Sequence, residues 1–258
     1  MNDDRDERWL CDLDGVVWLA DRPIPGAADA LARLSASGRQ VAFFTNNSHL
    51  RLDELVAKLE RCGVPARRED VLTSSAAAAG LLEPGERALV LGGPGILEAL
   101  AARAVDAVDA SGASDGPVDA VVVGIDLRLS YERLALAGRA VLDGARLIAT
   151  NDDPTFPTPE GLRPGAGAIL SALVAMTGAV PLVAGKPHPP AVELVRRRLH
   201  RVDVVVGDRP ATDGELARAL GARFALVRSG VTPAGAPPGA PAPDLDARDL
   251  AGLVAAGA

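Results

Sequence analysis

The sequence predicts an α/β fold built on a doubly wound parallel sheet, and two features of its patterning carry this prediction. Short apolar runs alternate with segments whose apolar residues recur at helical spacing, both near the start of the sequence and in its final third. Clusters of polar residues follow several of the apolar runs. This strand–helix–strand rhythm implies right-handed crossovers, which place the strands parallel and gather their carboxyl ends at one edge, where ligands bind.

The individual elements follow from this rhythm along the chain. Strands are predicted where apolar residues run together, at residues 9–13, 41–44, 88–91, 118–123, 146–149, 202–206 and 223–227. Helices are predicted where apolar residues recur every three or four positions, at residues 27–37, 52–59, 95–102, 130–142, 165–177, 191–199 and 211–220. The proline- and glycine-rich residues 150–167 are long for a plain connection and are typical of a functional loop. The prolines and glycines of residues 232–243, which show no periodicity, predict a stiff surface loop before a short final helix.

Length and composition restrict the class of protein. The 258 residues are many for one minimal domain and few for two full ones, and they fit one α/β domain that carries a large insertion. The net charge of −7 and the aromatic content of 3% argue against a nucleic-acid partner, which needs a basic surface or aromatic stacking platforms. No run approaches the roughly 18 consecutive apolar residues of a membrane span, so we expect no membrane partner.

Cysteine usage and the first residues of the sequence predict a cytoplasmic location. Cys11 and Cys62 are too few for a disulfide framework, and their spacing is not that of a metal-binding pair. Residues 1–8 are crowded with charged side chains and hold no apolar segment of the kind that a signal peptide requires. A reducing cytoplasm is therefore the expected compartment.

The most informative segment is Asp12-Leu13-Asp14-Gly15, where two carboxylates stand at the point at which a predicted strand breaks into a turn. Neighbouring carboxylates repel each other, so a bound cation or a raised pKa on one of them is required. Phosphoryl transfer uses both: one carboxylate attacks phosphorus, and the other protonates the leaving oxygen and then activates water against the acyl phosphate. The alternative is an acidic turn with a purely structural role, because motifs this short often occur without function.

Three further clusters fall at predicted strand ends or in adjacent loops. Thr45-Asn46-Asn47 offers a hydroxyl and amides to phosphate oxygens, although asparagines are also common turn formers. Gly185-Lys186-Pro187 places one of only two lysines in a rigid loop, where it can neutralise an anionic nucleophile and a phosphate together. The carboxylates of Asp208 and Asp213 are hard oxygen ligands that suit Mg²⁺. For Asp213, a role as an acidic residue that complements a helix N-terminus is the alternative.

In this order the motifs resemble the haloacid dehalogenase superfamily of phosphotransferases, and more narrowly its NagD-like branch. The resemblance covers residues 9–231 and rests on Asp12-x-Asp14-Gly15, Thr45-Asn46-Asn47-Ser48, Gly185-Lys186-Pro187 and Gly207-Asp208-Arg209-x-x-Thr212-Asp213. The stretch from Ala149-Thr150-Asn151-x-Asp153 through Pro164-Gly165-Ala166-Gly167 is also similar to that branch. The resemblance implies a doubly wound core from residues 1–80 and 183–258, with a large α/β cap inserted at residues 81–182.

The same resemblance implies the catalytic roles. Asp12 is the expected nucleophile and Asp14 the expected general acid/base, while Thr45 and Lys186 hold the phosphoryl group. Dehalogenases of the superfamily lack the second carboxylate and phosphate-transporting ATPases replace it, so Asp14 favours a phosphatase.

The metal site and the substrate contacts are implied in the same way. Mg²⁺ is expected to be bound by Asp12, the backbone carbonyl of Asp14, and Asp208, with Asp213 supporting the water shell of the metal. The further residues expected to contact substrate are Asn46, Asn47, Asn151, Asp153 and Arg163.

We therefore expect a Mg²⁺-dependent phosphatase that hydrolyses a small phosphorylated metabolite through an aspartyl-phosphate at Asp12. Phosphoglycolate, glycerol phosphate and nucleoside monophosphates are substrates that the resemblance implies, and it also implies a homodimer formed through the cap. Two alternatives stay open. A phosphomutase or phosphotransferase would pass the phosphoryl group to a second hydroxyl, and a non-catalytic protein would only bind a phosphometabolite, although the intact acid/base and lysine argue against the latter.

Overall fold

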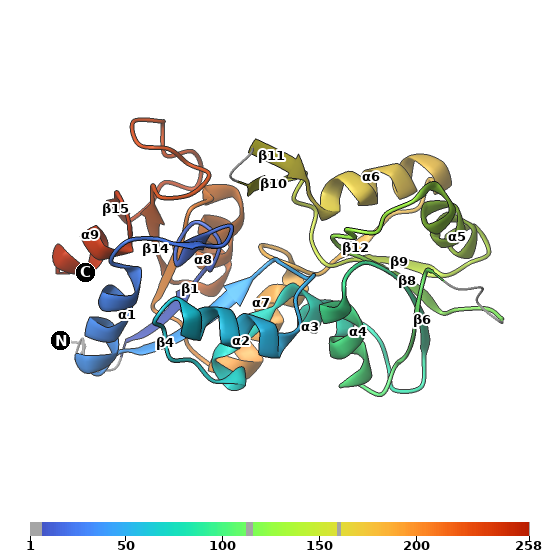
Figure 1. The fold of residues 1–258 in the computed structure, drawn as a ribbon, viewed down its shortest axis with the longest axis horizontal. Helices are drawn as coiled ribbons and strands as arrows, with labels where there is room; N and C mark the ends of the chain where they lie inside the picture. The colour runs from blue at the N-terminus through green and yellow to red at the C-terminus, as the bar shows by residue number, and fades with distance from the viewer. Residues whose placement is uncertain (1–6, 112–115, 159–160, 258) are drawn as a thin grey trace.

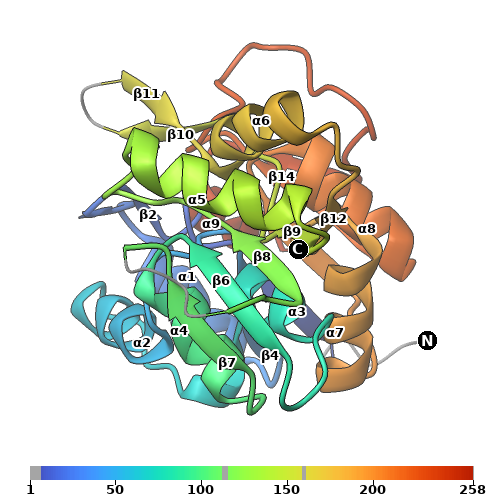
Figure 2. The ribbon, with the colours of Figure 1, turned by 90° about the vertical axis from the view of Figure 1, so that its right-hand side faces the viewer.

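The computed structural model describes residues 7–111, 116–158 and 161–257, and in it two parallel sheets are joined by helices (Figures 1 and 2). Residues 1–6, which hold most of the charged segment considered above, lie outside the described residues. The first sheet, here called the core sheet, has the strand order β15-β14-β13-β1-β4-β5. The second, here called the cap sheet, has the order β12-β9-β8-β6-β7. The paired strands of both sheets run parallel, which confirms the predicted fold class.

The core sheet combines strands from early and late parts of the chain. Its strands are β1 (Arg8–Cys11), β4 (Gln40–Thr45), β5 (Val71–Thr73), β13 (Val204–Gly207), β14 (Arg223–Val227) and β15 (Leu245–Ala247). Side chains alternate between its faces, so Trp9 and Cys11 lie in one hydrophobic cluster and Leu10 in another. Helices α1 (Ala27–Ala36), α2 (Leu52–Arg61) and α9 (Leu250–Ala255) cover the Trp9 face, and α3 (Ser74–Ala79), α7 (Pro189–Leu199) and α8 (Glu215–Leu220) the other.

The cap sheet comes from one continuous part of the chain. Its strands are β6 (Arg87–Leu91), β7 (Asp106–Asp109), β8 (Ala120–Val123), β9 (Arg146–Ala149) and β12 (Leu182–Val183). Helices α5 (Tyr131–Leu142) and α6 (Ala166–Thr177) cover one face, and α4 (Pro94–Ala101) packs on the other. The cluster that contains α4 also contains Phe44 of the core sheet and Val90 of the cap sheet, so the two sheets share one hydrophobic core.

Two antiparallel hairpins follow strand ends. The first joins β2 (Trp18–Leu19) and β3 (Arg22–Pro23) directly after the Asp12–Gly15 turn. The second joins β10 (Thr155–Thr158) and β11 (Gly161–Pro164), and it stands above the junction of the two sheets in Figure 1. This second hairpin lies within residues 150–167, for which the sequence predicts a loop. The two strands escape the prediction because prolines and glycines hide the alternation of a strand.

Most other elements lie within two or three residues of their predicted bounds. The predicted helix 211–220 begins instead as the π-helical turn η3 (Pro210–Gly214) and continues as α8. Gly214 fits this turn because a Cβ there would lie 3.0 Å from the ring of Phe224. The 3₁₀ turn η2 (Arg68–Asp70) and the short elements β5, α3, β7, β12 and β15 were not predicted, because so few residues give no periodic signal. Among the described residues, no helix is both long and apolar enough to span a membrane.

Candidate active site

The carboxyl ends of the core strands and the β10–β11 hairpin enclose a cleft of about 460 Å³. Each motif identified in the sequence contributes to its wall: Asp12 and Asp14 after β1, residues 45–47 at the end of β4, Lys186 before α7, and Asp208 after β13. They meet because β1 lies between β4 and β13, which puts three successive strand ends side by side.

A buried lysine lies between two of the carboxylates. Lys186 Nζ is 3.0 Å from Asp12 Oδ1 and 2.7 Å from Asp213 Oδ1, and only 3% of the Lys186 side chain is exposed. Burial alone would lower the pKa of Lys186, but the two carboxylates outweigh it and raise the pKa. The lysine is therefore a fixed positive charge that touches the expected nucleophile.

Asp208 is held by the backbone around it. Its Oδ2 accepts a hydrogen bond of 2.6 Å from the main-chain nitrogen of Val231. A Cβ on Gly15 would lie 2.4 Å from Asp208 Oδ2, and one on Gly230 only 1.9 Å, so both positions require glycine. Burial and the nearby charge of Asp213 raise the pKa of Asp208 to about 7.

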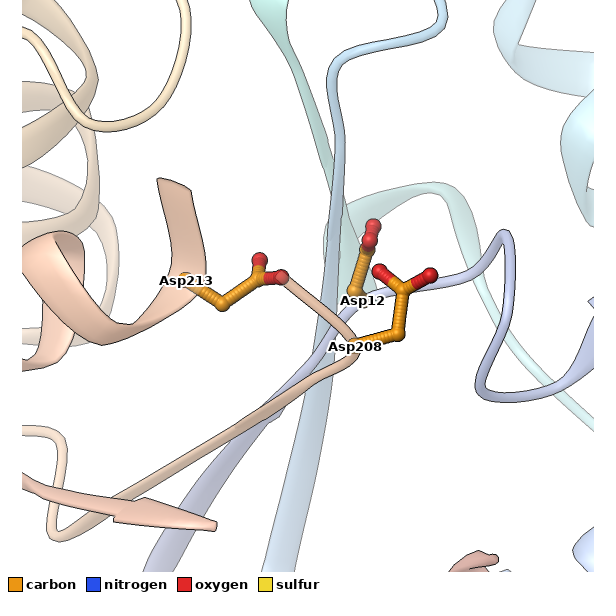
Figure 3. Close-up of side chains that lie close together, drawn as sticks. All are labelled: Asp12, Asp208 and Asp213. Carbon is orange, nitrogen blue, oxygen red and sulfur yellow. The ribbon is translucent and has the colours of Figure 1, made fainter. Parts of the chain in front are cut away.

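The carboxylates of Asp12, Asp208 and Asp213 form a candidate metal site, and Figure 3 shows them turned toward a common space. One oxygen from each lies within 4.8 Å of the others. Burial raises the pKa of Asp12 well above its usual range; Lys186 opposes this shift, and the three neighbouring aspartates add to it. Because one lysine cannot balance this charge, the site fits a divalent cation with hard oxygen ligands, such as Mg²⁺.

Asp14 occupies the other side of the turn after β1. Its Oδ1 accepts a hydrogen bond of 2.9 Å from Trp18 Nε1, which ties it to the β2–β3 hairpin. Burial raises the pKa of Asp14, while Lys58 and the Trp18 hydrogen bond oppose the shift. A raised pKa suits a carboxyl that must donate a proton at one stage and accept one at another.

The segment that follows β4 is folded back on itself. Thr45 is 1% exposed, and its Oγ1 accepts a hydrogen bond of 2.9 Å from the main-chain nitrogen of Asn47. Asn47 Oδ1 in turn accepts one of 3.0 Å from the main-chain nitrogen of His49. Thr45 and Asn47 both line the cleft. The side-chain carbonyl of Asn47 also stabilises a turn, which is the alternative role that the sequence allows for this asparagine.

Three expected substrate contacts, Asn46, Asn151 and Asp153, have hydrogen bonds to protein groups. Asn46 Nδ2 donates to Asp153 Oδ2 at 3.0 Å and to the main-chain oxygen of Lys186 at 3.1 Å. Asn46 Oδ1 accepts from the main-chain nitrogen of Lys186 at 2.9 Å. Asn151 Nδ2 donates to the main-chain oxygen of Asn46, and its Oδ1 accepts from the main-chain nitrogen of Asp153. Although all three line the cleft, these bonds favour positioning roles.

The β10–β11 hairpin brings an arginine to the rim of the cleft. Arg163 is exposed and lies directly opposite Phe156 in the strand register, and both side chains line the cleft. A second arginine, Arg209, belongs to the Gly207–Asp213 motif, and the sequence indicates no role for it. Its Nη1 lies 3.5 Å from Asp153 Oδ1, and its Nη2 donates to the main-chain oxygen of Thr155 at 3.3 Å. These partners lie more than 50 positions from Arg209 in the sequence. The only sequence signal for a role of Arg209 is therefore its position next to Asp208.

Comparisons with known proteins identify the family of this chain. A family model for haloacid dehalogenase-like hydrolases matches residues 9–106, and a related HAD-hydrolase-like model matches residues 183–253. The D-glycerol 3-phosphate phosphatase of Mycobacterium tuberculosis is 40% identical over 230 residues, which are 87% of this chain and 64% of that protein. This chain thus spans slightly less than two thirds of the length of that relative. The acid sugar phosphatase of Staphylococcus saprophyticus is 37% identical over 213 residues, which are 80% of each chain.

A solved structure is similarly close. The glycerol phosphate phosphatase of Mycobacterium tuberculosis, in complex with magnesium, superposes with a TM-score of 0.87 at 36% identity, over 96% of this chain and 76% of that one. With both the family models and these relatives matching, the chain belongs to the haloacid dehalogenase-like hydrolases and, within them, to the NagD-like phosphatases.

Proposed function

We propose that this protein is a Mg²⁺-dependent phosphatase that hydrolyses a small phosphate monoester through an aspartyl-phosphate at Asp12. The observation that carries the proposal is a cluster of three carboxylates at an open cleft, two of which contact one buried lysine. A phosphatase needs a nucleophile, a cation beside it and room for the ester, and this arrangement offers all three. The activities named for the Mycobacterium and Staphylococcus relatives support the same reaction.

In the first half of the reaction, Asp12 attacks phosphorus through a carboxylate oxygen. A new bond forms between Asp12 and phosphorus, and the bond between phosphorus and the ester oxygen breaks. Asp14 gives its proton to that leaving oxygen, which departs as an alcohol. Lys186 and Thr45 hold the phosphoryl oxygens, and the contact of Lys186 with Asp12 favours the ionised form of the nucleophile.

In the second half, Asp14 takes a proton from water. The water oxygen attacks phosphorus, the bond between phosphorus and Asp12 breaks, and inorganic phosphate leaves with both carboxyl groups restored. Asp12, the main-chain carbonyl of Asp14, and Asp208 would hold Mg²⁺, with Asp213 in support, and the metal would neutralise the negative charges of the nucleophile and the phosphate. The magnesium complex of the Mycobacterium relative supports this choice of metal.

The substrate is proposed to be small and to reach toward the β10–β11 hairpin. The cleft of about 460 Å³ has room for an ester of a few carbon atoms beside the phosphate, such as glycerol phosphate or phosphoglycolate. Asn47 is proposed to contact the phosphate end. Within the described ranges no carboxylate pairs with Arg163, which leaves its guanidinium available to a second polar or anionic group of the substrate.

Residues 81–182 are proposed to act as a cap that restricts the substrate, over a core of residues 1–80 and 183–258. The cytoplasmic location and the homodimer through the cap stay predictions.

The test is phosphate release from a panel of esters: p-nitrophenyl phosphate, glycerol 3-phosphate, phosphoglycolate and a nucleoside monophosphate. Each is measured with Mg²⁺ and with a chelator, for the wild type, Asp12→Asn, and the exposed control Asp143→Asn. We expect release that requires Mg²⁺, is abolished in Asp12→Asn and is unchanged in the control. If a folded wild type transfers phosphate only to a second alcohol, the protein is a phosphotransferase. If it binds esters without turnover, the enzymatic proposal fails.

A further inference from the structure

We propose that Asn46 and Asp153 are positioning residues that link docking of the cap sheet region to the placement of Lys186. Asn46 belongs to the core and Asp153 to the loop that follows β9 of the cap sheet. The proposal deepens the proposed function, and its kinetic part rests on that function.

The first observation is that Asn46 has no hydrogen-bonding capacity to spare on its amide nitrogen. A side-chain amide has two N–H donors, and those of Asn46 go to the main-chain oxygen of Lys186 at 3.1 Å and to Asp153 Oδ2 at 3.0 Å. Its Oδ1 accepts from the main-chain nitrogen of Lys186 at 2.9 Å. Asn46 therefore holds both polar main-chain atoms of the lysine.

This double contact fixes the point from which the lysine side chain extends. Gly185 packs against it, since a Cβ on Gly185 would lie 2.6 Å from Asn46 Oδ1 and 2.4 Å from the main-chain oxygen of Thr150. With its backbone held, Lys186 keeps Nζ within 3.0 Å of Asp12. Catalytic geometry of this kind is sensitive to small shifts, because a displacement of about 1 Å can cost roughly a hundredfold in rate.

The second observation is that the cap carboxylate closes this arrangement from the other side. Asp153 Oδ2 accepts from Asn46, and Asp153 Oδ1 lies 3.5 Å from Nη1 of Arg209, which follows Asp208. Arg209 also donates to the main-chain oxygen of Thr155, at the start of the β10–β11 hairpin. One carboxylate of the cap thus contacts both the segment that holds Lys186 and the loop that carries Asp208.

A neighbouring contact provides the matched control. Thr150 Oγ1 donates to Ser48 Oγ at 2.9 Å, also between the cap and the segment after β4. Both side chains are fully buried, and neither has a hydrogen bond to Lys186 in the described structure. Removing this contact loosens the same junction without releasing the lysine.

The kinetic test compares Asn46→Ala, Asp153→Ala and Thr150→Val with p-nitrophenyl phosphate. For the first two variants we expect kcat to fall by about tenfold or more and KM to change by less than about threefold, because a positioning loss acts on the transition state. Thr150→Val should keep kcat within about twofold. Asp153→Asn, which retains an acceptor for Asn46, should recover part of the kcat lost in Asp153→Ala. A rise in KM with unchanged kcat would instead make Asn46 a substrate ligand and overturn the proposal.

A second measurement does not depend on turnover. The main-chain amide of Lys186 donates to Asn46 Oδ1, so its hydrogen–deuterium exchange reports whether the lysine backbone is held. We expect exchange to become about tenfold faster or more in Asn46→Ala and in Asp153→Ala, and to stay unchanged in Thr150→Val. If Asp153→Ala leaves it unchanged, the link to the cap does not exist. If the wild type hydrolyses no ester, the proposed function fails, and the exchange result alone decides the link.

Discussion

Two clusters at strand ends of this molecule are built from the same parts and differ in their charge balance. In the core, Lys186 lies between Asp12 and Asp213, at 3.0 Å and 2.7 Å. In the cap, Arg133 lies between Asp109, at the end of β7, and Asp126, beyond the end of β8, at 2.6 Å from each. Both cations are buried, and both clusters lie at the carboxyl edge of a parallel sheet.

The surroundings of the two clusters differ in a way that supports a reactive role for the core cluster and a structural role for the cap cluster. The core cluster has a further carboxylate in Asp208, and burial raises the pKa of Asp12. In the cap, Arg128 adds a second cation at 2.5 Å from Asp109. Burial alone would raise the pKa of Asp109, but hydrogen bonds from Arg133 and other donors outweigh it and lower the pKa. The two clusters share a position at the carboxyl edge of a parallel sheet, and the balance of charge around each carboxylate is what distinguishes them.

After the complete loss expected for Asp12→Asn, the largest effect should come from Asp14→Asn, which leaves the core cluster in place and removes the proton donor. We expect kcat to fall by roughly 10²–10⁴-fold, the usual contribution of a general acid/base. The loss should be larger for glycerol 3-phosphate than for p-nitrophenyl phosphate, because nitrophenolate leaves without being protonated. Since burial raises the pKa of Asp14, its charge opposes folding, and urea unfolding should show unchanged or increased stability. Equal kinetic losses with the two esters would contradict the role of Asp14 as the acid.

In the cap cluster, substitutions should change the stability of the protein and leave its activity unchanged. Arg133→Met strands the buried carboxylate of Asp126 and should lower the free energy of unfolding by about 3–5 kcal/mol. Arg128→Met is the matched control: its side chain is 62% exposed, and its loss should cost no more than about 1 kcal/mol. Urea unfolding measures both, and kcat of the folded variants should match the wild type. Similar losses of stability in the two variants would mean that burial does not distinguish the two arginines.

The fold and the nucleophile motif could be predicted because their signals are local. Asp12 and Asp14 stand in one short segment after an apolar run, and each long strand or helix has its own periodicity. The role of Asn46 could not be predicted in the same way, because its amide meets Lys186 across 140 positions of sequence. The sequence could single out Asn46 as a candidate phosphate contact, but only the folded chain supplies its hydrogen-bond partners.

A smaller difference in stability is expected between alanine substitutions at two helical glycines, one at the junction of core and cap and one at the surface. Gly95 opens α4, and a Cβ there would lie 2.1 Å from the main-chain oxygen of Leu50, so Gly95→Ala should destabilise by about 1–3 kcal/mol. Gly252 in α9 is exposed, with its nearest contact at 3.4 Å, so Gly252→Ala should stabilise by about 0.4–1 kcal/mol. Thermal unfolding of both variants provides the comparison. Matching shifts would show that the first turn of α4 is not packed tightly against Leu50.

The smallest effect concerns acid stability of the cap. The pKa of Asp109 in the folded protein lies below its unfolded value, so its ionised form stabilises the fold. This contribution is present above the unfolded pKa of about 3.9 and is lost as the pH falls below it. The difference in unfolding free energy between the wild type and Asp109→Asn should therefore shrink between about pH 6 and about pH 3. A difference that is constant over this range would rule out an ionised Asp109 as the source.

The position of β1 between β4 and β13 also bears on how the chain folds during synthesis. Arg8 of β1 donates its main-chain N–H to Asp203, 195 positions later, whereas the cap sheet uses one uninterrupted segment that ends at β12. A ribosome therefore delivers every strand of the cap sheet before β13 can pair with β1. Until then one edge of β1 lacks its neighbour and is open to wrong pairing with other chains. Late closure of the central strand therefore leaves the nascent chain exposed to aggregation until its final third has been synthesised.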